Sequence, residues 1–211
     1  MTYTIHEVKD RKMLDRFIDF PYRLYRGNQY WAPPLKTDER KYLIDIPKVD
    51  EGIFTTQFVV LDKGKDVVGR IHVIINQHEI EFSGEKTARF NKIDFIDDYQ
   101  VSHLLLEAAE NWCRERGMKH LIGPFGYSNL DAAGTLTYGF DKLSCSSANY
   151  NYPYYIQHLK KAGYQYYLEW LEHEFNVPEK IPEKVTKCSE LIREKYNLST
   201  ALFDSKAEKA K

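Results

Sequence analysis

The stretch from residue 121 to 157 holds the densest set of side chains that could bind a small molecule. Its charged residues are Asp131, Asp141 and Lys142, and six of the chain's 16 tyrosines lie in it: Tyr127, Tyr138, Tyr150, Tyr152, Tyr154 and Tyr155. A long, weakly charged and aromatic connection is costly to order unless it packs against something. We expect it to line a pocket for a small-molecule ligand. The alternative is a packed Ω-loop that only caps a sheet.

Other reactive residue types form no recognisable site. Cys113, Cys145 and Cys188 make an odd count without a CxxC pair, which is typical of a reduced, cytoplasmic chain without structural zinc. His72 and His78 stand six residues apart, which is not a ligand spacing on a helix or a strand, so no metal is expected. The sequence contains neither GxSxG nor a phosphate-binding GxxxxGK[ST] loop.

Composition excludes several classes of partner. The 211 residues carry 30 Lys and Arg against 31 Asp and Glu, so no basic surface for a nucleic acid is expected. Apolar runs such as residues 73–75 are far too short to span a membrane, and the first residues lack the apolar centre of a signal peptide. With 29% charged and 43% hydrophobic residues, the chain is predicted to be a globular cytoplasmic protein.

Hydrophobic periodicity predicts alternating strands and helices. Strands are expected at residues 3–8, 54–61, 67–75, 87–96, 119–122 and 164–175, and helices at 99–116, 155–161 and 183–196. Asp10 is the expected N-cap of a first helix, which Pro21 should interrupt before a short second helix at 22–26. Arg70 and His72 are expected on a half-solvated face of the third strand.

Several short motifs resemble one known superfamily. These are the strand and helix at 89–116, the late helix ending in Ala162-Gly163-Tyr164, and the segments FPYRLYR (20–26), WAPPL (31–35), VGRI (68–71), GP (123–124) and GFD (139–141). Together they resemble the GNAT (GCN5-related) N-acyltransferases, most closely a poorly characterised bacterial GNAT-like group. The resemblance implies an α/β (α+β) fold of the GNAT-like acyl-CoA N-acyltransferase type, with a mixed, mostly antiparallel sheet flanked by helices.

The resemblance also implies where a site would lie. The position of the family's base corresponds to Asp94, although strand alternation with Lys92 and Phe90 favours a plain surface or paired carboxylate there. The family's tyrosine acid corresponds to Leu159, and Tyr155, one turn earlier, is the candidate substitute. The residues expected to bind acetyl-CoA or another acyl-CoA, in a gap between the fourth and fifth strands, are Asn91, Ile93, Phe95, Ser128 and Asn129.

The expected pyrophosphate cradle is degenerate. The family uses a glycine-rich turn at the start of the long helix, where bare N–H groups meet the phosphates. Here residues 96–101 contain no glycine, and Tyr99 and Val101 place Cβ atoms where the backbone should approach phosphate. Asp97 and Asp98 are better explained as caps of the helix than as neighbours of an anion. A conventional grip on coenzyme A is therefore not expected.

The predicted organisation is a GNAT-like domain at residues 1–176, followed at 177–211 by a linker helix and the start of a second, truncated repeat. The tail from 197 to 206 resembles residues 4–12, a strand followed by a charged helix start; the alternative is an ordinary frayed tail. The leading function is transfer of an acyl group to a small amine. The alternatives are a non-catalytic ligand- or partner-binding module and the N-terminal half of a tandem acyltransferase, and a homodimer is a further expectation.

Overall fold

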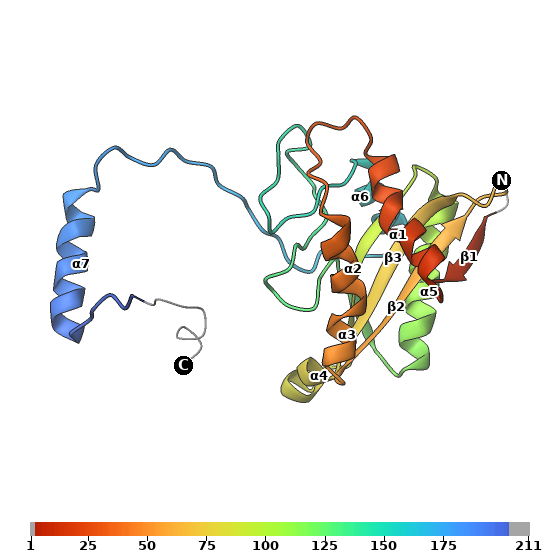
Figure 1. Cartoon of the computed structure of the whole chain (residues 1–211), viewed down its shortest axis with the longest axis horizontal. Coiled ribbons are helices and arrows are strands. Elements are labelled where there is room, and N and C mark those ends of the chain that lie inside the picture. Colours follow the sequence, from red (N-terminus) through yellow and green to blue (C-terminus); the bar gives the residue numbers. More distant parts are fainter. Residues whose placement is uncertain (1–2, 203–211) are drawn as a thin grey trace. The chain divides into compact units, whose positions relative to one another are not determined.

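The computed structural model describes residues 3–202 and divides the chain into two units, Met1–Leu171 and Glu172–Lys211 (Figure 1). The first unit contains β1 (Thr4–Glu7), α1 (Arg11–Leu24), α2 (Lys36–Ile44), α3 (Ile46–Val49), β2 (Ile53–Leu61), β3 (Val67–Asn76), α4 (Gln77–Ser83), β4 (Thr87–Phe95), α5 (Tyr99–Glu115), β5 (His120–Ile122) and α6 (Tyr154–Lys161). The second unit contains α7 (Glu183–Tyr196).

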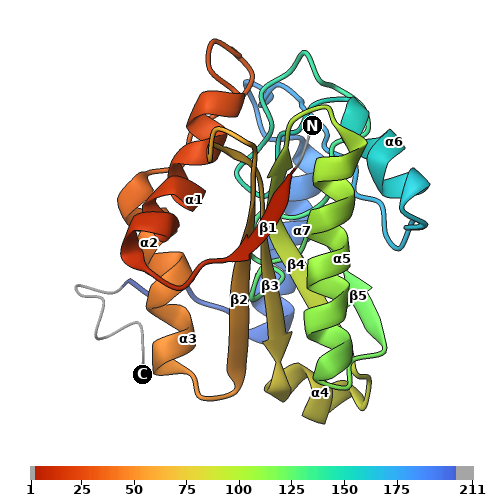
Figure 2. The same cartoon turned by 90° about the vertical axis from the view of Figure 1, so that its right-hand side faces the viewer.

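The sheet of the first unit has five strands in sequence order. Neighbours pair antiparallel from β1 to β4, and β5 alone runs parallel to β4. Helix α5 covers one face, and α1 and α2 cover the other (Figure 2). Gly69 on β3 allows α5 to come close, because a Cβ at this position would lie 2.7 Å from a methyl carbon of Val101. The predicted mixed, mostly antiparallel sheet flanked by helices is confirmed.

Strand β4 contains a bulge that decides which side chains face which helices. Arg70 pairs with Asp94 and His72 pairs with Asn91, so two residues of β4, Lys92 and Ile93, stand opposite one residue of β3. Lys92 adopts a φ of 47° at this point. The extra residue places Asn91 and Asp94, three positions apart, on the same face of the sheet. Simple alternation, which groups Asp94 with Phe90, therefore gives the wrong face.

The first helix differs from the prediction. Asp10 caps it as expected, accepting a hydrogen bond from the N–H of Met13 at 2.8 Å. Pro21, however, lies inside a single helix that continues to Leu24, and the separate helix predicted at 22–26 does not form. Phe17, Ile18 and Phe20 bury their side chains beneath this helix, so packing on the sheet outweighs the hydrogen bond that Pro21 removes.

The chain after α6 also departs from the prediction. Residues 164–175 alternate like a strand but pair with no other strand in the part of the chain that the structure describes. Alternation predicts side-chain direction only, whereas a strand also needs a partner for its backbone groups. The same applies to residues 197–202 of the predicted repeat, and its continuation to 206 lies outside the described residues. Helix α7 forms where the sequence predicts a helix.

Candidate functional site

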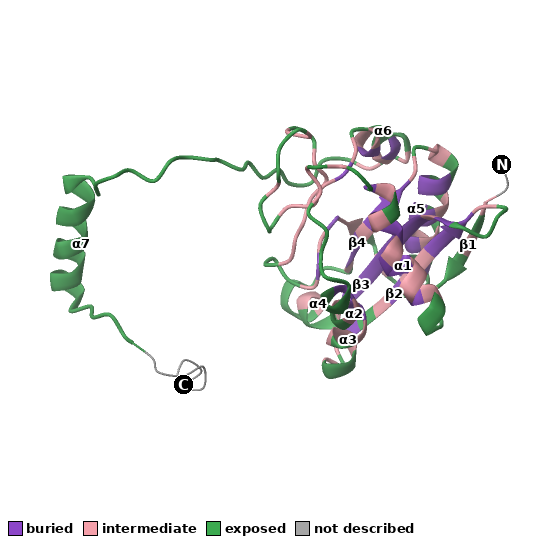
Figure 3. Ribbon diagram, turned by 45° about the horizontal axis from the view of Figure 1, so that its top comes forward, coloured by how far each residue is buried: buried purple, intermediate pink, exposed green. Residues whose placement is uncertain are grey.

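A row of buried polar side chains lies on the face of β3 and β4 beneath α1 and α2. Arg70 is 4% exposed and His72 is fully buried, so the prediction that they lie on a half-solvated face is wrong. Asn91 and Asp94 from β4 and Glu39 from α2 are buried with them. Most of the ribbon of β3 and β4 is coloured as buried (Figure 3). The sequence pattern shows that these residues are polar, but it does not show that two helices cover this side of the sheet.

Four charges alternate in sign along this row, which we call the charge row: Lys92, Glu39, Arg70 and Asp94. The Lys92 Nζ lies 2.6 Å from one carboxylate oxygen of Glu39, and the Arg70 Nη1 lies 3.8 Å from the other. The Nε of Arg70 lies 2.7 Å from Asp94, and its Nη1 also donates to the carbonyl of Phe17 at 3.1 Å. The charge row therefore fastens α1 and α2 to β3 and β4, and each buried charge has an opposite neighbour.

Two tyrosine hydroxyls join Asp94 to the edge of β4. The hydroxyl of Tyr25 donates to the Oδ1 of Asp94 at 2.9 Å and lies 3.0 Å from the hydroxyl of Tyr155. The Tyr155 hydroxyl accepts the N–H of Phe95 at 3.1 Å, and its ring stacks on the Phe95 ring. Burial, followed by the nearby Asp94 charge, raises the pKa of both tyrosines well above the usual value. Both side chains are therefore neutral hydroxyl donors at physiological pH.

A second hydrogen-bonded chain begins at His72. Its Nδ1 lies 2.7 Å from the amide oxygen of Asn91, which can only accept, so Nδ1 carries the proton. The amide nitrogen of Asn91 donates to Tyr42 at 2.7 Å, and the Tyr42 hydroxyl donates to Asp131 at 3.4 Å. Burial lowers the pKa of His72 to about 3. His72 is therefore a neutral imidazole whose free nitrogen faces the hydroxyl of Tyr127 at 3.5 Å.

The start of α5 is where an acyl-CoA would need bare backbone N–H groups, and this chain caps it with its own side chains. One carboxylate oxygen of Asp98 accepts the N–H of Gln100 at 2.9 Å, and the other accepts the hydroxyl of Tyr3 at 2.9 Å. The Nε2 of His158 lies 3.0 Å from Asp97, and the ammonium of Lys161 lies over the ring of Tyr99. Carboxylates and an aromatic ring thus surround the first turn of α5, where a bound phosphate would need open N–H groups and no negative charge nearby.

A serine, a histidine and an aspartate meet here without forming a nucleophilic site. The Oγ of Ser102 lies 2.9 Å from the Nδ1 of His158, whose other nitrogen contacts Asp97. Ser102 is fully buried, whereas 66% of the Asp97 side chain is exposed. In a nucleophilic site the serine must reach the substrate, and the carboxylate that orients the histidine is normally buried. Here the serine is buried and the carboxylate is exposed. The three residues hold α6 against the first turn of α5.

The gap between β4 and β5 is also filled. Their pairing ends at Arg89 and Ile122, so the two strands do separate beyond that point. At the far end of β4, however, the N–H of Phe95 donates to Tyr155, and its carbonyl accepts the hydroxyl of Tyr154 at 2.5 Å. Both backbone groups of Phe95 therefore have partners and are not open to an amide-bearing ligand. The residues present, here and at the start of α5, therefore do not fit coenzyme A.

The predicted site residues separate into two groups. Asp94, Asn91 and Tyr155 belong to the buried network described above, and Ile93 and Phe95 pack in the apolar core on the α5 side. Ser128 and Asn129 lie instead in an exposed turn, and Ser128 meets the network at Asp131, whose carboxylate accepts the Ser128 N–H at 3.0 Å. The catalytic roles assigned to Asp94 and Tyr155 stay predictions.

A pocket of about 440 Å³ opens beside this network. Its walls come from the loop after α1 and from the aromatic stretch, and they consist of Arg26, Gly27, Asn28, Gln29, Tyr30, Phe140, Tyr150 and Tyr152. The rings of Tyr150 and Tyr152 pack against Tyr25, whose hydroxyl bonds Asp94. The sequence predicts a pocket formed by residues 91–95, 123–129 and 150–155; the lining of this pocket includes Tyr150 and Tyr152 from the third segment and no residue from the first two.

Sequence reasoning missed three members of the site, Tyr25, Glu39 and Tyr42. Tyr25 belongs to the FPYRLYR motif, which drew attention as a family signature and not for its hydroxyl. Glu39 and Tyr42 are three residues apart on α2 and so lie on the same face of the helix. This spacing predicts that their polar groups point in the same direction. The high tyrosine count was the available signal, since buried tyrosines need partners for their hydroxyls.

Two absences concern only the residues that the structure describes. Within 3–202, no three His, Cys, Asp or Glu side chains are grouped so that they could hold a metal ion. Over the same residues, every helix is too short or too polar to cross a membrane.

Comparison with known proteins gives both sequence relatives and a fold. No protein-family model matches the chain. Protein YghO of Escherichia coli is 36% identical over 152 residues, or 72% of this chain, and the bacterial ceramide synthase of Caulobacter vibrioides is 34% identical over 137 residues, or 64%. The chain spans only 38% and 35% of these two proteins. A tandem GNAT protein from the clavulanic acid biosynthesis pathway superposes with a TM-score of 0.52 at 15% identity, over 77% of this chain and 43% of that protein.

Proposed function

We propose that this chain, which has the GNAT acyltransferase fold, is one unit of an N-acyltransferase that joins an acyl group to the amine of a long-chain amino alcohol. The relationship to a bacterial ceramide synthase carries this proposal. A ceramide is the amide of a fatty acid and a long-chain amino alcohol, so its synthesis is an N-acylation. The GNAT fold found here is a scaffold for that type of transfer.

Within such an enzyme, this unit is proposed to recognise the acceptor. The start of α5 and the edge of β4 are filled by the chain's own side chains, so no step is assigned to coenzyme A in this unit. On the α1 side of the same end of β4 lies a pocket that Tyr25 joins to a buried carboxylate. Its lining is more polar than apolar, so it suits the amine and hydroxyl groups of the acceptor, and tyrosine rings in its walls can pack on the carbon atoms beside them.

Asp94 is the proposed proton acceptor. When a neutral amine attacks an activated acyl donor, a C–N bond forms, the bond to the donor's leaving group breaks and that group departs with the electron pair, and the nitrogen loses one proton. A carboxylate within hydrogen-bonding reach can take this proton, directly or through a hydroxyl. Tyr25 links Asp94 to the pocket, because its hydroxyl contacts Asp94 and its ring contacts two residues that line the pocket. The Tyr155 ring packs on Phe95 and Tyr154, which do not line the pocket, and its hydroxyl contacts that of Tyr25, so Tyr155 is proposed as a positioning residue that orients Tyr25.

The second candidate function is a non-catalytic binding module on the same fold. It is favoured by two observations. The burial of Tyr155 keeps the predicted tyrosine acid away from solvent, and the capped start of α5 leaves no open binding site there for the acyl donor. Both functions require a ligand in the pocket, and they differ in whether Asp94 affects chemistry as well as binding.

Acceptor binding tests the proposal. Isothermal titration with a water-soluble, short-chain analogue of sphinganine is expected to show saturable binding, and the matching alcohol without the amine should bind at least tenfold more weakly. Tyr25→Phe, which removes only a hydroxyl, should weaken binding, whereas Tyr138→Phe at an 84% exposed position should not. Equal affinity for both ligands, or no binding of the amine, would contradict an amine acceptor.

Chemistry separates the two candidates. The full-length enzyme that contains this unit is mixed with palmitoyl-CoA and the amine analogue. Mass spectrometry of the reaction mixture should detect the N-acylated product, and Tyr25→Phe should lower kcat. Binding of the amine without any product would favour the non-catalytic module.

A further inference from the structure

Helix α7 presents an apolar face that nothing in its own unit covers. Every residue from 172 to 202 is exposed, including Val185, Leu191 and Ile192 on this face. The opposite face is polar and carries the Glu183–Lys187 ion pair. A 14-residue helix is marginal in water on its own, and most helices owe their stability to the packing of such a face. Helix α7 is therefore built to be covered on one side.

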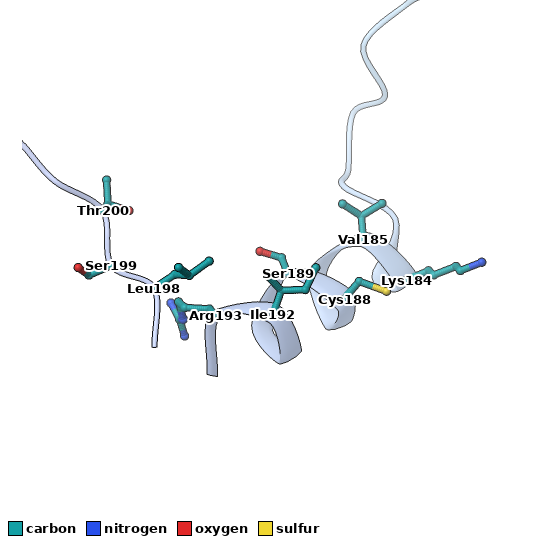
Figure 4. Close-up of a pocket in the computed structure, with 9 residues that line it drawn as sticks. All are labelled: Lys184, Val185, Cys188, Ser189, Ile192, Arg193, Leu198, Ser199 and Thr200. Carbon is teal, nitrogen blue, oxygen red and sulfur yellow. The ribbon is translucent and has the colours of Figure 1, made fainter. Parts of the chain in front are cut away.

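The end of α7 turns the chain back over this face. Asn197 adopts a left-handed conformation with a φ of 48°, and the N–H of Leu198 bonds the carbonyl of Arg193 at 2.9 Å. This closure places Leu198 beside the helix and forms an apolar groove of about 640 Å³, with Val185, Cys188 and Ile192 along it (Figure 4). Leu198 and the residues after it are thus part of the same surface as the helix.

The order of elements indicates what the surface fits. Residues 198–202 alternate between Leu198, Thr200 and Leu202 on one side and small residues on the other, which is typical of a strand with one buried face. A helix joined by a tight turn to such a strand normally packs on the sheet that the strand enters. Among the described residues of its own unit, 172–202, there is no strand, so the sheet that this segment fits lies outside the unit.

We propose that α7 and residues 198–202, which we call the C-terminal docking surface, pack on a second GNAT-fold unit and add a strand to its sheet. Three observations identify this partner. The sequence from 197 to 206 resembles residues 4–12, which contain the first strand, β1, and the start of α1 in the GNAT-fold unit described here. Both curated relatives are more than twice as long as the part that this chain matches, and the superposed GNAT structure is a tandem protein. This proposal does not depend on acyl transfer.

Site-specific photo-cross-linking tests the proposal in the cells that produce the protein. A benzophenone amino acid at Ile192 is expected to cross-link to a second GNAT-fold unit whose sequence differs from residues 1–171, in the same or another polypeptide, with the joined peptides identified by mass spectrometry. The same probe at Lys187, on the polar face of α7, should give at least tenfold less of that product. Cross-links from Ile192 to residues 1–171 of this chain, to a second copy of it, to an unrelated protein, or to nothing would overturn the proposal.

A second measurement uses the purified 211-residue chain. The chain is expected to be a monomer by light scattering, and the amides of α7 should exchange with solvent far faster than those of α5. A dimer that Ile192→Glu dissociates would show that a second copy covers the surface. Strong protection of α7 in a monomer would show that the chain covers it itself. Either result would contradict the proposal.

Discussion

The two sides of the sheet at the carboxyl end of β4 place charged side chains in different environments. At the start of α5, Asp97 and Asp98 lie near the surface: Asp98 caps the helix where a phosphate-binding enzyme needs open backbone, and Asp97 contacts His158. Under α1 and α2, Asp94 and Glu39 are buried and each meets a cation. The comparison teaches that side chains close the start of α5, where the family would bind an acyl donor, and that a costly polar network is kept on the side proposed here for the acceptor. Substitutions can test each half of that contrast.

The largest expected effect comes from breaking the charge row. Arg70→Met removes the cation that contacts Asp94, Glu39 and the carbonyl of Phe17, and leaves two buried carboxylates short of a partner. We expect a loss of about 3–5 kcal/mol in the free energy of unfolding, measured with denaturant. Arg114→Met, at an ion pair whose arginine is 68% exposed, should change it by less than about 0.5 kcal/mol. Similar losses in the two variants would show that burial of the row has no special role.

His72 should make the stability of the protein fall with acid. Burial lowers its pKa in the folded state to about 3, against 6.5 for a solvated histidine. Because the unfolded chain binds this proton first, the stability contribution is complete above pH 6.5 and is lost as pH falls towards 3. His72 alone should remove about 2 kcal/mol between pH 6.5 and 4.5.

The variant His72→Gln removes the part of the pH dependence of stability that His72 causes. It is expected to be less stable than the native chain at pH 7, but its stability should change less between pH 6.5 and 4.5, as measured by denaturant titrations across that range. His173→Gln, at an exposed position, should keep the native slope. An unchanged slope in His72→Gln would mean that His72 is solvated and that the polar face is open.

Removal of one buried hydroxyl should have an intermediate effect. Tyr155→Phe keeps the ring on Phe95 but leaves the N–H of Phe95 without its partner and frees Tyr25 on one side. An unsatisfied buried N–H costs about 1–3 kcal/mol, so thermal unfolding should occur at a lower temperature. Tyr138→Phe, at an 84% exposed position, provides the matched control and should unfold like the native chain. A native Tm for Tyr155→Phe would imply that a ligand or water can replace the hydroxyl at this edge.

The smallest expected effect concerns the cap of α5. Asp98→Ala removes the acceptor for the N–H of Gln100 and for the hydroxyl of Tyr3, and should cost about 1 kcal/mol in the free energy of unfolding. Asp97→Ala, which removes a side chain that is 66% exposed, should cost less. If Asp97→Ala is the more destabilising change, the Asp98 cap is not the contact that closes the start of α5.

The sequence predicted the elements whose pattern is local. The long helix at 99–116 is present because its apolar stripe, acidic cap and terminal Gly117 all favour the same structure. The paired strands at 53–76 are likewise recovered around their turn. The strand predicted at 164–175 did not form, because alternation does not supply a pairing partner.

The site was harder to predict because it depends on contacts across the fold. Tyr25 and Asp94 are 69 residues apart, and the bulge at Lys92 reverses the face on which Asp94 lies. Neither a bulge nor the covering of a strand by α1 and α2 can be read from side-chain alternation. The resemblance to the GNAT family nevertheless selected Asp94 and Tyr155, which the structure joins in one hydrogen-bonded network.

Titration of the native chain with acetyl-CoA tests most directly whether the start of α5 is closed to the acyl donor. Isothermal calorimetry is expected to show no saturable heat up to millimolar ligand, while a GNAT enzyme with a glycine-rich cradle, measured in the same buffer, should bind. Saturable binding with a micromolar Kd, abolished by competition with free coenzyme A, would contradict the account, because the side chains at the start of α5 would then not exclude the donor.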